Sequence, residues 1–238
     1  MCTVLIADDE LATVKQLFNS IIERNKEVKL IGITNNGEEV LNIMEKDPPD
    51  ILLLDLMMPK MNGFQVMEKL IAEKKKYLIK TKIIVISSYI DKLYRHREYL
   101  DYIYAMLAKP YSVDQLMKFI DRIDEEIKED KIEKYVKEEL NTFSFNKDTD
   151  AYKYLKETIC VAIRNNNMKV GLETDIYKKI AIIHKKSPIQ IKWAIEKLMN
   201  SMYMNTRCEI IKSYFEFVED KKPTTKVFIQ HIVDNYKK

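Results

Sequence analysis

The sequence is short of the features that mark disulfide-bonded, secreted or membrane-spanning proteins. Its three cysteines lie far apart, with no CxxC pair and no histidine pattern nearby, so neither a disulfide framework nor a zinc site is predicted. No apolar run reaches the roughly 18 residues that a bilayer crossing needs. The first ten residues lack the basic start of a secretory signal. We therefore expect a cytoplasmic protein with no membrane partner.

Charge is distributed unevenly along the 238 residues, although the formal net charge is only +3. Residues 1–120 carry 17 basic and 17 acidic residues, residues 121–148 carry 6 and 10, and residues 149–238 carry 17 and 10. This pattern predicts a neutral domain, an acidic connector and a basic domain. The basic excess is a weak indication of a polyanionic partner, because a helical domain can also carry such charges on a merely solvated surface.

Short apolar runs alternate with helical patterns in the first 120 residues. The runs have the length of strands and are continuously apolar, which is typical of strands covered on both faces. Such an order predicts an α/β domain with a parallel sheet and right-handed crossovers. Ligands of these sheets bind at the carboxyl ends of the strands. The runs are Val4–Ala7, Leu30–Ile33, Ile51–Leu54, Ile83–Ile86 and Ala105–Ala108, and the helical patterns are Leu11–Asn25, Gly37–Lys46, Phe64–Lys75 and Asp91–Leu100.

The second half contains no convincing strand, so an all-α domain is predicted for residues 149–238. The connector, residues 121–148, is rich in charge but carries apolar residues at helical spacing. The helix that starts near Ser112 is therefore expected to continue through it, either as a self-pairing coil or as a solvated linker helix. The 3.5-residue rhythm breaks near Asp130, which favours the solvated linker. The helices predicted beyond it are 150–165, 175–184, 188–203, 206–218 and 225–236.

Acidic residues follow two of the predicted strands, Asp8 and Asp9 after the first and Asp55 after the third. Because these strand ends share one edge of a parallel sheet, the carboxylates should converge, which is costly unless a hard cation such as Mg²⁺ lies among them. Ser87 ends the fourth strand and Lys109 ends the fifth. The set predicts a carboxylate nucleophile, a metal and two donor groups around one phosphoryl position.

With these residues the sequence resembles the receiver domains of two-component response regulators over residues 3–120. The most specific signal is the run Asp55–Gly63 (DLMMPKMNG), which stands with the pair Asp8-Asp9, with Ser87 and with Lys109-Pro110. The resemblance implies a flavodoxin-like five-stranded sheet of order 2-1-3-4-5. It also implies that Asp55 takes phosphate from a sensor histidine kinase or phosphotransfer protein, with Mg²⁺ held by Asp8, Asp9 and Asp55. Ser87 would bond the phosphoryl group, Lys109 would pair with it, and a homodimer would form on phosphorylation.

One departure from the family concerns its usual aromatic switch residue, three positions before the lysine. Met106 occupies this position. Tyr104 lies two residues earlier, on the same side of a strand by the two-residue period. Either Tyr104 takes over the switch, or Met106 merely fills the core.

A strong helix start occurs at Ser187, with Ser as the N-cap, Pro188 at the first helical position and Gln190 at the capping-box position. The predicted helix 175–184 precedes it across the tight turn Lys185–Ser187. This is the pattern of a helix-turn-helix, whose second helix enters the DNA major groove while the lysines of the turn contact phosphates. The candidate DNA-binding residues are Lys185, Lys186, Ser187, Ile189, Gln190, Lys192, Trp193 and Lys197.

Residues 150–238 are similar to the output domain of the sporulation stage-zero A transcription regulators. The similarity follows the phrases YLKE at 154–157, IYKKIA at 176–181 and KPT at 222–224, in matching order. The family positions that read DNA with arginines and an acid fall here on Gln190, Lys192 and Trp193, so the resemblance implies DNA binding with altered specificity.

The alternative is a response regulator whose degenerate helix-turn-helix binds a protein, with Gln190 serving only its helix cap and Trp193 anchoring an interface. A third class is a phosphatase of the haloacid dehalogenase type, which also uses an aspartate nucleophile and Mg²⁺. Such enzymes need a second aspartate two residues after the nucleophile, where this chain has Met57. We therefore expect a phosphorylation-controlled transcription regulator and not an enzyme.

Overall fold

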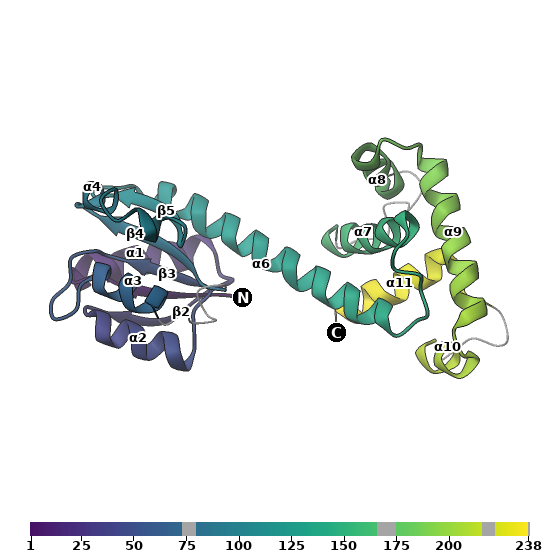
Figure 1. The fold of residues 1–238 in the computed structure, drawn as a ribbon, viewed down its shortest axis with the longest axis horizontal. Helices are drawn as coiled ribbons and strands as arrows, with labels where there is room; N and C mark the ends of the chain where they lie inside the picture. Colours follow the sequence, from purple (N-terminus) through teal and green to yellow (C-terminus); the bar gives the residue numbers. More distant parts are fainter. Residues whose placement is uncertain (73–79, 166–174, 216–221, 238) are drawn as a thin grey trace. The chain divides into compact units, whose positions relative to one another are not determined.

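The computed structural model describes residues 1–72, 80–165, 175–215 and 222–237 (Figure 1). Contacts divide the chain into two units, Met1–Ile127 and Lys128–Lys238. Within the described ranges, no helix combines the length and apolar character that a membrane crossing requires.

The first unit is built on one sheet of five parallel strands in the order β2-β1-β3-β4-β5, which confirms the predicted flavodoxin-like receiver fold (Figure 1). The central strand β3 is buried along its whole length, because both faces of the sheet are covered. This burial explains why its sequence is continuously apolar. The strands are β1 Cys2–Ala7, β2 Val28–Thr34, β3 Ile51–Leu54, β4 Lys82–Ser87 and β5 Ile103–Ala108.

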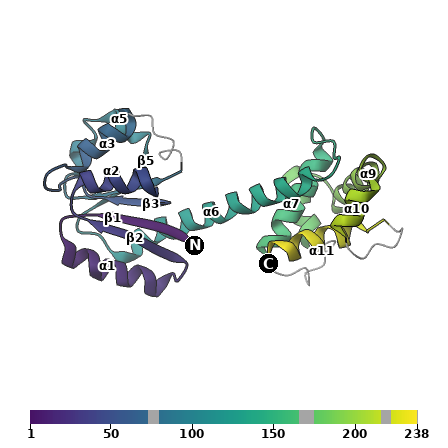
Figure 2. The same ribbon diagram turned by 90° about the horizontal axis from the view of Figure 1, so that it is seen from below.

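Helices cover the sheet in two layers (Figure 2). One face packs against α1 and the first half of α6, and the other face packs against the remaining helices of the unit. Along β3, Leu53 belongs to the first layer and Leu52 and Leu54 to the second. The helices are α1 Leu11–Arg24, α2 Gly37–Lys46, α3 Gly63–Ala72, α4 Ile90–Leu93, α5 Arg97–Leu100 and α6 Val113–Asn141.

The helix predicted over Asp91–Leu100 is divided into the two single turns α4 and α5. Its buried residues, Leu93 and Tyr99, are six positions apart, a spacing that points to different sides of one continuous helix. A break at His96 allows both to reach the core, and the imidazole of His96 stacks on the ring of Tyr99 with centroids 5.2 Å apart.

Tyr104 and Met106 do not share a side of β5, so that prediction is wrong. Ile83 pairs with Ile103 and Ile84 with Ala105, which leaves Tyr104 as an extra, bulged residue in the register. A bulge breaks the two-residue period of a strand. Tyr104 therefore packs in the layer of α1 and α6, where its hydroxyl donates to Glu126 Oε1 at 2.8 Å, whereas Met106 packs in the opposite layer.

The secondary-structure elements that the structure describes in the second unit are all helices, which confirms the predicted all-α output. Thr149 caps α7, Ser187 caps α9 and Thr224 caps α11 through their side-chain oxygens. The helix α9 buries Ile191, Ile195, Leu198 and Met202, whose spacing of three and four residues places them on one helix face. The helices are α7 Asp150–Arg164, α8 Tyr177–His184, α9 Pro188–Asn205, α10 Cys208–Tyr214 and α11 Thr225–Tyr236.

The second half of α6 differs from the solvated linker helix that we expected. Ile132, Val136 and Leu140 are buried in the core of the second unit, and the Tyr135 hydroxyl donates to the carbonyl of Ile232 at 3.1 Å. Their regular four-residue spacing forms an apolar stripe that a packed helix can bury. The domain limits at residues 120 and 148 remain predictions, although α6 clearly contributes to the cores of both units.

Leu140→Ala should lower the free energy of unfolding of the output domain by about 2–5 kcal/mol, because it leaves a cavity in that core. Hydrogen exchange measured peptide by peptide should accelerate in α7, α9 and α11 and stay unchanged in the sheet of the first unit. Glu138→Ala, at an exposed position of the same helix, is the matched control. A solvated linker would instead give a change within about 0.5 kcal/mol for both variants.

Candidate functional site

Three carboxylates converge at the carboxyl edge of the sheet, as the strand ends predicted. Ala7 of β1 pairs with Leu54 of β3, and the Asp55 N–H donates to the Ala7 carbonyl at 2.8 Å. This pairing places Asp8 beside Asp55, and oxygens of Asp8, Asp9 and Asp55 all lie within 4.8 Å of one another. Asp8 and Asp55 are buried while Asp9 is exposed, so the cluster is open to solvent on one side.

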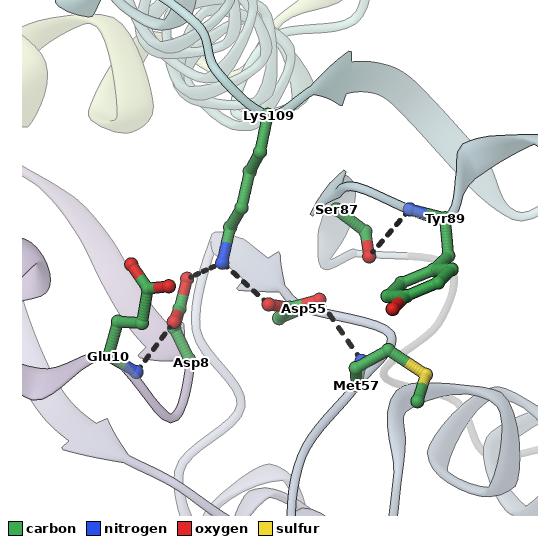
Figure 3. A network of polar contacts seen from close by, with 7 residues as sticks. All are labelled: Asp8, Glu10, Asp55, Met57, Ser87, Tyr89 and Lys109. Atoms are coloured by element: carbon green, nitrogen blue, oxygen red, sulfur yellow. Dashed lines mark hydrogen bonds and ion pairs between the residues drawn. The ribbon is translucent and has the colours of Figure 1, made fainter.

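Lys109 compensates the negative charge of this cluster. Its Nζ lies 2.6 Å from Asp55 Oδ2 and 2.8 Å from Asp8 Oδ2 (Figure 3). Burial lowers the pKa of Lys109, but hydrogen bonds and charge from Asp55 and Asp8 outweigh burial and raise the pKa above its usual value. The side chain is therefore a stable ammonium held between the two buried acids.

Ser87 is the last residue of β4, the strand that pairs with β3 on the side away from β1. The side chain is fully buried, and its Oγ accepts the N–H of Tyr89 at 3.3 Å. In Figure 3 Ser87, Tyr89 and Met57 border the side of Asp55 that faces away from Lys109. The hydroxyl and the ammonium thus flank the same carboxylate.

Two backbone donors at the site were not predicted from the sequence. The N–H of Met57 donates to Asp55 Oδ1 at 3.0 Å, and the N–H of Glu10 donates to Asp8 Oδ1 at 2.9 Å (Figure 3). Both are turns in which an aspartate accepts from the backbone two residues later. These bonds fix the orientation of each carboxylate and leave the Oδ2 atoms to Lys109.

The loop that follows Asp55 explains why the run Asp55–Gly63 ends in glycine. The N–H of Gly63 donates to the Leu56 carbonyl at 3.0 Å, which closes the loop against the strand end. A Cβ atom at position 63 would lie 2.3 Å from the carbonyl oxygen of Asp55. Only glycine permits this approach, so the residue positions the backbone of the candidate phosphate acceptor.

The cluster has the donor set that a magnesium ion prefers. Mg²⁺ binds through hard oxygen ligands, usually one or two carboxylates together with waters and phosphate oxygens. Asp8, Asp9 and Asp55 supply such oxygens from one edge of the sheet, and the exposed Asp9 gives a cation access from solvent. The residues therefore fit a divalent cation.

A cavity of about 500 Å³ adjoins the cluster, between α1 and the segment that follows β5. Asp8 and Lys109 form part of its lining, and its walls combine polar and apolar side chains. The lining residues are Asp8, Glu10, Val14, Leu17, Ser20, Ser88, Lys109, Pro110, Tyr111 and Val113.

The candidate DNA-binding residues lie on α9 and in the turn that joins α8 to it. The capping box is present, because Ser187 Oγ accepts from Gln190 N at 3.2 Å and Gln190 Oε1 accepts from Ser187 N at 2.9 Å. Lys185 has a left-handed backbone, with φ 52°. Lys192 is half-buried, and the other candidates are exposed: Lys185, Lys186, Ser187, Ile189, Gln190, Trp193 and Lys197.

Comparison with known families agrees with this organisation. Residues 4–121 match the response regulator receiver domain, and residues 136–236 match the sporulation initiation factor Spo0A C-terminal domain. The chain belongs to the response regulator family. A receiver joined to a Spo0A-type domain implies that the output of this response regulator is transcriptional.

Individual relatives match the receiver. The protein-glutamate methylesterase/protein-glutamine glutaminase of Bacillus subtilis is 33% identical over 92 residues, 39% of this chain and 24% of that protein, so the chain spans about a quarter of this relative. The receiver of AraT from Geobacillus stearothermophilus has 26% identity and a TM-score of 0.47 over 55% of this chain and 98% of its own. A LuxR-family DNA-binding response regulator from Staphylococcus aureus has 20% identity and a TM-score of 0.45 over 52% and 98%.

Gly63→Ala should destabilise the receiver by about 3 kcal/mol or more, because the added Cβ meets backbone that cannot move without displacing Asp55. Gly32→Ala is the control, since its Cβ would meet only the side-chain ends of Leu5 and Ile43, at 3.2 and 3.4 Å. We expect the control to stay within about 1 kcal/mol of the parent protein in urea denaturation. Equal effects of the two substitutions would contradict this role of Gly63.

Proposed function

We propose that this response regulator accepts a phosphoryl group on Asp55 and that its output domain binds DNA to regulate transcription. The observation that carries the proposal is the position of Lys109, whose ammonium lies between the buried carboxylates of Asp8 and Asp55. The carboxyl edge of the sheet thus holds a nucleophile, a cation and a hydroxyl donor, which together have the composition of a phosphoryl-transfer site.

The proposed reaction begins with a phosphohistidine on a sensor histidine kinase or a phosphotransfer protein. A carboxylate oxygen of Asp55 attacks the phosphorus, and the bond between phosphorus and the imidazole nitrogen breaks as the new oxygen–phosphorus bond forms. The N–H of Met57 holds one carboxylate oxygen in place during the attack. Lys109 would then pair with one phosphoryl oxygen, and the hydroxyl of Ser87 would donate to another.

Asp8, Asp9 and Asp55 are the residues that we propose to hold Mg²⁺. When bound, the ion would neutralise charge on the phosphoryl oxygens and orient them for in-line transfer. The cavity beside Asp8 and Lys109 supports the approach of the donor protein, because it gives a protein side chain a recess with both polar and apolar walls next to the site.

Asp55→Asn should abolish labelling by acetyl phosphate in the presence of Mg²⁺, because the amide is a poor nucleophile. Asp50→Asn is the matched control, since Asp50 is equally buried but precedes β3 and accepts hydrogen bonds from Thr3 at 2.9 Å. We expect the control to label at the parent rate in a mass-spectrometric assay. Labelling of the Asp55 variant would identify another carboxylate as the acceptor.

The turn Lys185–Ser187 supports DNA binding by the output domain. Lys185 occupies a left-handed position that costs a non-glycine residue about 1 kcal/mol. Its N–H donates to the Ile182 carbonyl and the N–H of Lys186 donates to the Ala181 carbonyl, so both backbones end α8 and both ammonium groups remain exposed. Glycine would adopt the same backbone conformation at a lower free-energy cost. The presence of lysine at this position therefore supports a role of its positive charge in DNA binding.

Two further properties belong to this proposal. We place the protein in the cytoplasm, where a kinase and chromosomal DNA are both accessible, and we propose no enzymatic output, because the methylesterase relative matches only part of the receiver. Homodimerisation on phosphorylation stays a prediction. The competing function is a protein-binding output, which is favoured by the exposure of Trp193 at 64% of its surface.

Lys185→Gly and Lys186→Ala should each weaken binding to all DNA sequences alike. Each change should reduce the slope of log affinity against log salt concentration by about 0.9, as one phosphate contact is lost. The stability of the Lys185→Gly variant should not fall, because glycine suits φ 52°. Lys226→Ala, which removes one exposed charge from α11, is the control in fluorescence anisotropy titrations and should leave the slope unchanged.

A further inference from the structure

Large apolar side chains are exposed together at the helix-turn-helix. Ile189 and Trp193 are four residues apart on α9, so they lie on one face of the helix, and they are 57% and 64% exposed. Ile182 and Ile183, at the end of α8, are 78% and 64% exposed. Exposed apolar groups gathered in this way mark a surface that is covered when a ligand binds.

Lysines lie at both ends of the apolar face of α9. Lys185 and Lys186 precede it in the turn, and Lys197 follows Trp193 by four residues on the same face. These two groups of lysines suit the two phosphate backbones that border a DNA groove, and the apolar residues between them would face the base edges in the groove. This charge pattern favours DNA over an apolar protein surface as the occupant.

Two of the usual base-reading contacts are missing from α9. Residues 175–206 contain no arginine, so the bidentate guanidinium contact to guanine is absent from this segment. Gln190 uses its Oε1 to accept the Ser187 N–H, so its carbonyl is engaged in the helix cap. A bidentate contact to adenine needs both the carbonyl and the amide group of Gln190, and it is therefore unavailable while the cap is intact.

Resting on the proposed DNA-binding function, we propose that Ile189 and Trp193 read the 5-methyl groups of thymine in the major groove. The thymine methyl is the apolar group that base edges present there, and apolar side chains recognise it by contact. The output domain therefore prefers sequences rich in thymine at the positions under the first turns of α9. Specificity comes from burial of methyl groups, and affinity comes from the lysines.

The test compares DNA duplexes that differ only in this methyl group. The full-length protein is titrated with alternating poly(dA-dT) and with poly(dA-dU), which lacks the methyl, and then with poly(dG-dC) before and after replacement of cytosine by 5-methylcytosine. We expect about fourfold tighter binding for each methyl group buried. The thymine duplex should bind more tightly than the uracil duplex, and methylation of cytosine should increase affinity.

Variants assign the effect to the two residues on α9. The double variant Ile189→Ala/Trp193→Ala should bind the thymine and uracil duplexes equally and keep the parent salt dependence, because the lysines are intact. The double variant Ile182→Ala/Ile183→Ala removes comparable exposed apolar surface from α8 and should keep the preference for thymine. All four residues are exposed, so the fold should tolerate the changes.

The possible failures are distinguishable. Equal affinity of the parent protein for thymine and uracil duplexes, with a steep salt dependence, would overturn the methyl-reading inference and leave the DNA-binding function in place. Absence of binding to every duplex at low salt would overturn the proposed function itself and favour a protein partner. Loss of the thymine preference in the α8 variant would overturn the assignment to Ile189 and Trp193.

Discussion

The ion pairs of Lys109 with Asp8 and Asp55 are the interaction on which the receiver depends. Two buried carboxylates at one strand edge repel each other, and the ammonium that lies 2.6 and 2.8 Å from them makes their proximity tolerable in the absence of a metal. Phosphorylation of Asp55 would add negative charge at this point. Lys109 directly follows β5, and β5 also carries Tyr104, whose hydroxyl bonds Glu126 of α6. The cation that neutralises the acceptor is thus carried at the end of the strand that is hydrogen-bonded to the connecting helix.

The connecting helix α6 is not a passive spacer in either unit. Ile123 and Ile127 pack with the receiver, and Ile132 begins the stripe that packs with the output core. The step of five residues between Ile127 and Ile132 breaks the four-residue spacing found on either side. This step is the rhythm break visible in the sequence near Asp130, and it lies at the division between the two units. Apart from the buried Asp124, the acidic residues of this helix segment are exposed or half-buried, so high charge and core packing are compatible here.

Much of the receiver was predictable because side-chain chemistry and strand ends determine it. Continuous apolar runs indicated a sheet covered on both faces, and shared strand ends placed Asp8, Asp55 and Lys109 together. Features that depend on the backbone were not predictable: the N–H of Met57 on Asp55, the bulge at Tyr104 and the break at His96. The sequence does not indicate which backbone N–H groups donate to side chains, because every residue except proline carries the same N–H group. A bulge or break is set by which residues the core must bury, and single-segment periodicity does not contain that information.

The output domain departs from ordinary stability rules at the helix-turn-helix. Lys185 has a left-handed backbone that glycine would adopt more easily. Ile189 and Trp193 are large apolar residues, yet they are exposed to solvent instead of packing in the core. The same helix has a complete capping box at Ser187 and a buried apolar stripe that begins at Ile191. Local rules that fail together at one place are typical of a functional site. Lys185, Ile189 and Trp193 are therefore residues of the output domain whose type the fold does not require.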